Sequence, residues 1–90
     1  MPIELRIRTG ARAGQTESFD QPVVVIGRDA SCDLRFDATR DLDVSARHAE
    51  VRASHDGTGW LVRDAGSTNG TYVNGTRLGA GRAHALRSAT

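Results

Sequence analysis

The sequence predicts an all-β fold, a β-sandwich of two twisted and mostly antiparallel sheets. Apolar and polar residues alternate with a period of two in several segments, which is the pattern of a half-buried strand. Candidate strands of about four to seven residues recur roughly every ten residues and are joined by turns rich in Gly, Asp and Asn. No segment carries the apolar stripe of an amphipathic helix, so a helical bundle or an α/β fold is excluded.

The N-terminal candidate strands differ in how much of their surface they are expected to bury. In residues 3–8, apolar Ile3, Leu5 and Ile7 alternate with charged residues, which indicates one buried face. The segment 22–27, PVVVIG, is a β-branched run that we expect to be buried on both faces. The other candidate strands are residues 15–20, 32–36, 48–53 and 60–65.

A hairpin is predicted near the end of the chain. The strand segments 71–74 and 76–78 meet at the pair Asn74-Gly75. Both of these residues tolerate a positive φ, so the pair favours a tight type I′ turn. We expect a single domain over residues 1–90, because the sequence shows no internal repeat, no low-complexity tract and no sign of a second domain.

The composition excludes several classes of function. Twelve basic and eleven acidic residues give a net charge of +1, which argues against a nucleic-acid footprint. One cysteine, Cys32, excludes an internal disulfide and suits a reducing compartment. The N-terminus lacks the pattern of a signal peptide, and no apolar run approaches the length of a membrane span. We therefore expect a soluble cytoplasmic chain that binds neither nucleic acid nor membrane.

Catalytic and metal sites are also disfavoured. Asp37, Asp41 and Asp43 lie close together, but they lack the glycine and the terminal Glu of a calcium loop, so no metal and no other cofactor is expected. A small hydrolase could be built on Ser45, His48 and Asp64, and it would need Ser45 and His48 to share a hydrogen bond. Ser45 and His48 are three residues apart at a strand entry, and no nucleophile-elbow motif surrounds them. We expect no enzyme.

Three loop segments are rich in hydrogen-bond donors. They are Gly27-Arg28, the stretch from Ser45 to His48, and the stretch from Ser67 to Gly70. Together they supply an arginine fork, several hydroxyl groups and an amide, all of which suit a compact oxyanion. In a β-sandwich such loops carry the function, because the strands hold them in fixed positions.

In order and spacing, these segments resemble the forkhead-associated (FHA) domain, a phosphothreonine-binding β-sandwich. The resemblance covers residues 3 to about 79 and depends on IGR, VSARHAEV and DAGSTNGTYVNG. It implies a module that recognises phosphothreonine in a partner protein, a Ser/Thr kinase or its substrates. A phosphate-independent interaction scaffold is the alternative, since sandwich faces can bind partners without an anion.

The resemblance also implies roles for single residues. Arg28 and Ser45 match the residues that bind the phosphate, Thr68 matches the contact to the phosphothreonine, and Asn69 matches the residue that holds the peptide main chain. Secondary candidates for contact are Arg47 and Ser67, and structural support is expected from Gly27, His48 and Gly70.

One position departs from the family pattern. The residue after the family's serine is often basic, whereas here it is Ala46. Arg47 could substitute for it, although strand alternation from Ser45 would direct Arg47 to the opposite face. The phosphate affinity is therefore expected to be lower than that of relatives with the basic residue.

The end of the chain differs from the family as well. Members of the family continue with a final apolar strand that pairs beside the first strand, whereas GAGRAHALRSAT contains only Leu86 as a large apolar residue. We expect this last strand or strands to be missing, so that the edge of residues 3–8 is unpaired. A shortened domain of low stability, or an oligomer that pairs strands between copies, would follow.

Overall fold

The computed structural model of the chain describes residues 2–55, 59–79 and 81–86. These residues form strands, turns and loops, and they contain no helix that could cross a membrane. The strands are β1 (Ile3–Arg6), β2 (Thr16–Phe19), β3 (Val23–Gly27), β4 (Leu34–Arg35), β5 (Ala49–Ala53), β6 (Trp60–Asp64), β7 (Tyr72–Val73), β8 (Thr76–Arg77) and β9 (Ala83–Leu86). The prediction of an all-β fold is confirmed.

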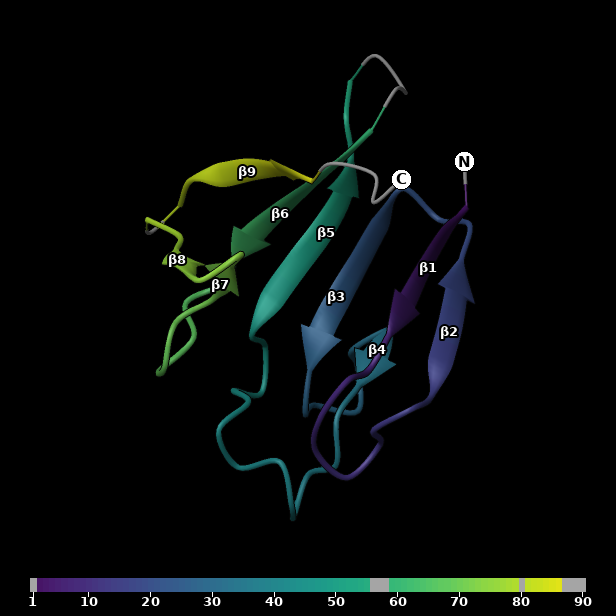
Figure 1. The fold of residues 1–90 in the computed structure, drawn as a ribbon, viewed down its shortest axis with the longest axis vertical. Coiled ribbons are helices and arrows are strands. Elements are labelled where there is room, and N and C mark those ends of the chain that lie inside the picture. Colours follow the sequence, from purple (N-terminus) through teal and green to yellow (C-terminus); the bar gives the residue numbers. More distant parts are fainter. Residues whose placement is uncertain (1, 56–58, 80, 87–90) are drawn as a thin grey trace.

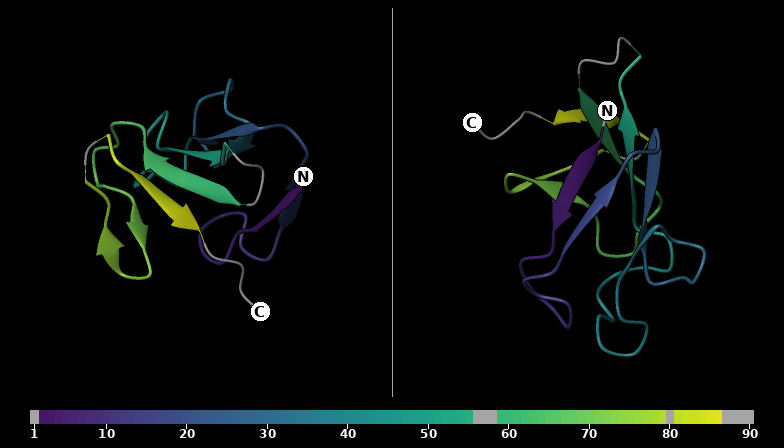
Figure 2. Two further views of the ribbon diagram at one scale, coloured as in Figure 1. Left: turned by 90° about the horizontal axis from the view of Figure 1, so that it is seen from above. Right: turned by 90° about the vertical axis from the view of Figure 1, so that its right-hand side faces the viewer.

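The strands form one large sheet and two small ones (Figure 1). The five-stranded sheet has the order β4-β3-β5-β6-β9, and β1 with β2 and β7 with β8 form two-stranded sheets. All pairs are antiparallel except β3 with β4. Two views at right angles show β1 and β2 in a separate layer in front of the large sheet (Figures 1 and 2).

The core lies between these layers. Val24, Val51 and Val62 occupy register-matched positions on the neighbouring strands β3, β5 and β6, and all three are buried. Ile7, Leu34 and Trp60 complete the buried cluster. From the other layer, Ile3, Leu5 and Phe19 pack against it. Full burial of such a side chain stabilises a fold by about 1.5 to 3 kcal/mol. The contacts of Ile3, Leu5 and Phe19 with the buried cluster therefore hold the two layers together.

Strand β3 is less buried than its sequence predicts. Val24 is completely buried, but Val23, Val25 and Ile26 are only half-buried. The β-branched run therefore forms a central strand with one face in the core and the other face partly covered. The expectation of burial on both faces is wrong.

The structure confirms the predicted hairpin but differs from the prediction for the segment that follows it. Asn74 and Gly75 have φ of 50° and 82°, which confirms the predicted turn between β7 and β8. The AHAL segment, in contrast, forms strand β9 and pairs with β6 in the large sheet. The segment that we expected to be too weak for a strand thus supplies one edge of this sheet. Within the described residues, β1 pairs only with β2, as expected.

The topology brings three loops to one end of the large sheet. Ile26, Ala49 and Asp64 are register partners on β3, β5 and β6, so the end of β3, the start of β5 and the end of β6 lie side by side. Figure 1 shows the connections from β4 to β5 and from β6 to β7 leaving at this end. These connections carry the predicted site residues.

Candidate functional site

The site is built on a direct contact between two backbones. A Cβ added at Gly27 would lie 2.2 Å from the carbonyl oxygen of Ala46, so only glycine fits at the end of β3. The N–H groups of Arg28 and Asp29 donate to the carbonyl oxygens of Ser45 and Ala46 at 3.1 and 3.0 Å. Gly27 thereby places Arg28 directly beside the loop that carries Ser45.

Arg28 is held by carbonyl oxygens and not by a carboxylate. Its Nη1 donates to the carbonyl of Ala38 at 3.0 Å, and its Nε donates to the carbonyl of Val44. In the described part of the chain, Arg28 forms no ion pair. Two neutral acceptors orient the guanidinium without cancelling its charge, and the N–H groups of Nη2 are left for another acceptor.

His48 joins the Ser45 loop to the loop after β6. Its Nδ1 accepts the backbone N–H of Ser45 at 3.1 Å, and its Nε2 lies 2.8 Å from the carbonyl oxygen of Gly70. Because Nδ1 accepts, the proton is assigned to Nε2, which donates to Gly70. The imidazole therefore connects the two loops through its two ring nitrogens.

Ser45 and Asn69 link the same two loops from the solvent side. The backbone N–H of Thr68 donates to Oγ of Ser45 at 2.9 Å, and Nδ2 of Asn69 donates to the carbonyl of Asp43 at 3.0 Å. Thr68 and Asn69 are exposed, and Ser45 is half-buried. The structure thus brings Arg28, Ser45, Thr68 and Asn69 to one surface, with polar groups that still face solvent.

Asp64 organises the loop that carries Thr68 and Asn69. Its carboxylate accepts the N–H groups of Gly66 and Ser67 at 3.0 and 3.1 Å, the hydroxyl of Thr71 at 2.6 Å and the hydroxyl of Ser67. Partial burial raises the pKa of Asp64, but the hydrogen bonds from Ser67, Thr71 and Gly66 outweigh it and lower the pKa to about 2. A charged Asp64 therefore fixes both ends of this loop.

The secondary candidates have different surroundings. The hydroxyl and the N–H of Ser67 both donate to Asp64, so these donors stabilise the loop and are not directed at a ligand. Arg47 is exposed, and its charge adds a small contribution to the hydrogen bonds from Ser31 that lower the pKa of Asp29. Gly70 has a φ of 88°, in the left-handed region that favours glycine.

The sequence did not reveal which carboxylates shape the loops. Asp37 accepts the N–H and hydroxyl of Thr39, and Asp41 accepts the N–H groups of Ala11 and Asp37. Asp37 followed two residues later by Thr, and Asp64 followed by Gly and Ser, are Asx-turn patterns that could have indicated the local contacts. The contact from Asp41 to Ala11 spans 30 residues, and no local pattern predicts it.

One end of the sandwich thus gathers hydroxyl groups, an amide and an arginine that has no acidic partner in the described residues, and all of these groups suit an anionic ligand. The chain belongs to the FHA domain family, whose model matches residues 24–90. The resemblance noted in the sequence is thus confirmed, together with the β-sandwich fold that it implied.

Two curated relatives are actinobacterial regulators. The glycogen accumulation regulator GarA of Mycolicibacterium smegmatis is 43% identical over 70 residues, which are 78% of this chain and 41% of that protein. The oxoglutarate dehydrogenase inhibitor of Corynebacterium glutamicum is 41% identical over 70 residues, which are 78% of this chain and 46% of that protein. The chain therefore spans less than half the length of either relative.

Two solved structures share the fold. One, from a structural and functional analysis of phosphothreonine-dependent FHA domain interactions, has a TM-score of 0.77 and 30% identity, covering 97% of this chain and 80% of its own. The other is the FhaA FHA domain complexed with the intracellular domain of Rv3910, with a TM-score of 0.68 and 32% identity, covering 82% of this chain and 72% of its own. By family and fold this chain is an FHA domain.

Proposed function

We propose that this chain binds a phosphothreonine-containing segment of a partner protein in Ser/Thr-kinase signalling, through Arg28, Ser45, Thr68 and Asn69. The observation that carries the proposal is the state of Arg28, whose guanidinium is oriented by two carbonyl oxygens and has no acidic partner in the described residues. A phosphate carries about −1.5 to −2 charges near neutral pH and supplies strong acceptors for the remaining N–H groups.

The other three residues have matching capacities. Oγ of Ser45 accepts from Thr68, so its own proton is available to a phosphate oxygen. Thr68 borders the phosphothreonine from the neighbouring loop. Asn69 uses one of its amide protons on Asp43, which leaves its second proton and its carbonyl oxygen for the main chain of an extended peptide.

Recognition without catalysis is part of the proposal. The ring nitrogens of His48 bind the backbone of Ser45 and Gly70, and Asp64 binds its own loop, so these residues do not form a nucleophile, base and carboxylate relay. The names of the two relatives describe a regulator and an inhibitor. We place the module in the cytoplasm, where it would meet a Ser/Thr kinase or that kinase's substrates.

Titration calorimetry with three matched peptides tests the function. The peptides carry threonine, phosphothreonine or phosphoserine at one position in the same sequence, which is first selected from a degenerate phosphothreonine library. We expect no binding of the threonine peptide. Burying one methyl group contributes roughly 0.8 to 3 kcal/mol, so phosphothreonine should bind about four- to a hundred-fold more tightly than phosphoserine. Equal binding of threonine and phosphothreonine would instead identify a phosphate-independent scaffold.

A further inference from the structure

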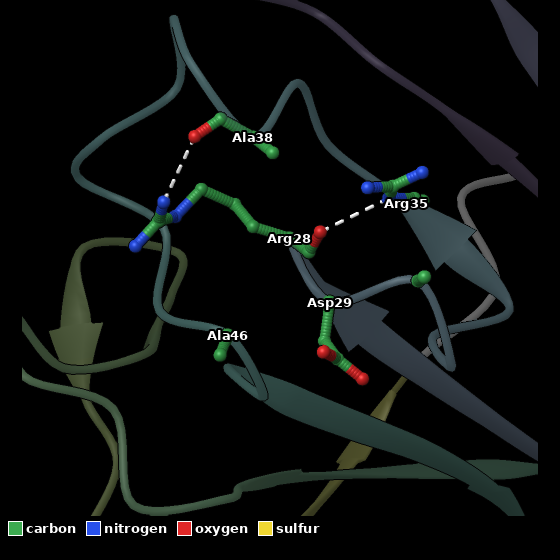
Figure 3. A pocket seen from close by; sticks show the side chains of 6 residues that line it. Arg28, Asp29, Arg35, Ala38 and Ala46 are labelled. Carbon is green, nitrogen blue, oxygen red and sulfur yellow. Dashed lines mark hydrogen bonds between the residues drawn. The ribbon is translucent and has the colours of Figure 1, made fainter.

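A pocket of about 330 Å³ opens beside the arginine that we assign to phosphate binding (Figure 3). Its lining residues are Arg28, Asp29, Ala30, Arg35, Ala38 and Ala46. Half of these residues are alanines, so short methyl groups limit the pocket on several sides. Ala46 is the position at which the family often has a basic residue, and its small side chain helps to leave this space open.

Arg35 is fixed in this pocket by its surroundings. Its Nε donates to the carbonyl oxygen of Arg28 at 3.0 Å, and its own carbonyl accepts from Nη1 of Arg12 at 2.6 Å. Arg12 is itself paired with Glu17 at 2.8 Å. The two terminal nitrogens of Arg35 carry four N–H donors, and in the described residues none of them donates to a protein acceptor. Arg35 thus offers a positioned cationic fork to a ligand.

The two guanidinium groups of the pocket do not converge. Figure 3 shows the guanidinium of Arg28 turned toward the carbonyl of Ala38, whereas Arg35 approaches the Arg28 backbone from the other side. A phosphate held by Arg28 is compact and uses the fork on its own side. The arrangement therefore suits two separate anionic groups better than one shared phosphate.

The carboxylate in the pocket is already engaged. Asp29 accepts the hydroxyl and the N–H of Ser31, and these hydrogen bonds, with smaller contributions from the charges of Arg47 and Arg35, lower its pKa. Asp29 is exposed, so solvent screens its charge. The terminal N–H groups of Arg35 stay available to an anion, because the carboxylate of Asp29 is engaged with Ser31 and not with Arg35.

We propose that Arg35 and this pocket form a second subsite, which binds another oxyanion of the same peptide, a carboxylate or a second phosphate near the phosphothreonine. The proposal rests on the proposed function. It makes Arg35 a determinant of specificity and assigns the partner segment an acidic or doubly phosphorylated sequence.

Fluorescence anisotropy with a set of phosphothreonine peptides tests the subsite. In an alanine background, a glutamate, a glutamine or a phosphoserine is moved through the three positions on each side of the phosphothreonine. Each peptide is titrated with the unchanged protein, Arg35→Gln, Arg28→Ala and Arg52→Gln. Arg52 is the matched control, because it is an exposed arginine that pairs with Glu50 on β5 and does not line the pocket.

For the unchanged protein and Arg52→Gln, we expect glutamate at one position to bind about two- to five-fold more tightly than glutamine, as for a partly exposed ion pair, and phosphoserine more tightly still. In Arg35→Gln this ratio should fall to about one. An equal ratio in Arg35→Gln and the unchanged protein, or no preferred acidic position, would overturn the subsite while Arg28-dependent binding upheld the function. If the unchanged protein bound none of the phosphothreonine peptides, both the subsite and the proposed function would be overturned.

Discussion

The backbone N–H of Thr68 donates a hydrogen bond of 2.9 Å to the side-chain oxygen of Ser45, 23 residues earlier in the chain. This bond connects the two loops that are proposed to surround the phosphate. It also uses an acceptor site of the hydroxyl and leaves the proton free. Ser45 therefore joins the two loops in addition to its proposed role in binding the phosphate.

Ser45→Ala should weaken phosphothreonine binding about 10- to 100-fold, because a hydrogen bond to a charged group contributes about 1.5 to 3 kcal/mol. Titration calorimetry measures the loss. Ser18→Ala is the control, since Ser18 is exposed on β2 in the other layer. Equal affinities for both variants would remove Ser45 from the site.

Arg28→Ala should abolish binding of a peptide of micromolar affinity. Losing the charged partner of a bound anion costs about 2 to 5 kcal/mol. Arg28→Lys should recover only part of the affinity, because an ammonium group keeps the charge but cannot reproduce the fork directed at Ala38 and Val44. Arg63→Ala is the control, because Arg63 on β6 pairs with Glu50, and this variant should bind the peptide normally. Unchanged calorimetric affinity of Arg28→Ala would refute its assignment.

Part of this site could be predicted from the sequence, and part could not. Asn74-Gly75 correctly indicated the hairpin, because that turn depends on local backbone geometry. The close contact of Gly27 with the Ala46 carbonyl joins residues far apart in the sequence, so it became visible only in the folded chain. The hydrogen bond from Arg12 to the carbonyl oxygen of Arg35 could not be predicted, because it depends on how the turn between β1 and β2 packs against β4 in the folded chain. Strand β9 was missed because its weak alternation reveals a partner only once β6 offers an edge.

Asp64→Asn should destabilise the domain at neutral pH by about 1 kcal/mol, because four donors lose a charged acceptor. The folded pKa of about 2 lies below the ordinary value of 3.8, so Asp64 stabilises the fold above pH 4. That contribution is lost as the pH falls through about 2. Urea denaturation of both proteins between pH 6 and pH 2 should show their difference shrinking toward acid, and a constant difference would contradict the role of the charge.

The free side of β1 predicts association or low stability. Ile7 donates its N–H to Gln15 on the β2 side, so the alternate residues Glu4 and Arg6 direct theirs away from β2. We expect light scattering to show association that rises with concentration, or thermal melting below about 45 °C. Arg6→Pro removes one edge N–H and should reduce any association. A monomer at all concentrations that melts near 45 to 65 °C would contradict the expectation.

The contact between Gly27 and the Ala46 carbonyl means that different atoms set the position of the loops and the choice of peptide. The spacing between β3 and the Ser45 loop is set by main-chain atoms, while the residues proposed to meet the peptide project from that frame as side chains. Exchanging an exposed side chain such as Arg35, which does not join the two loops, should therefore change the preferred peptide sequence without moving the phosphate position. Gly27 is the residue that such a redesign must leave untouched.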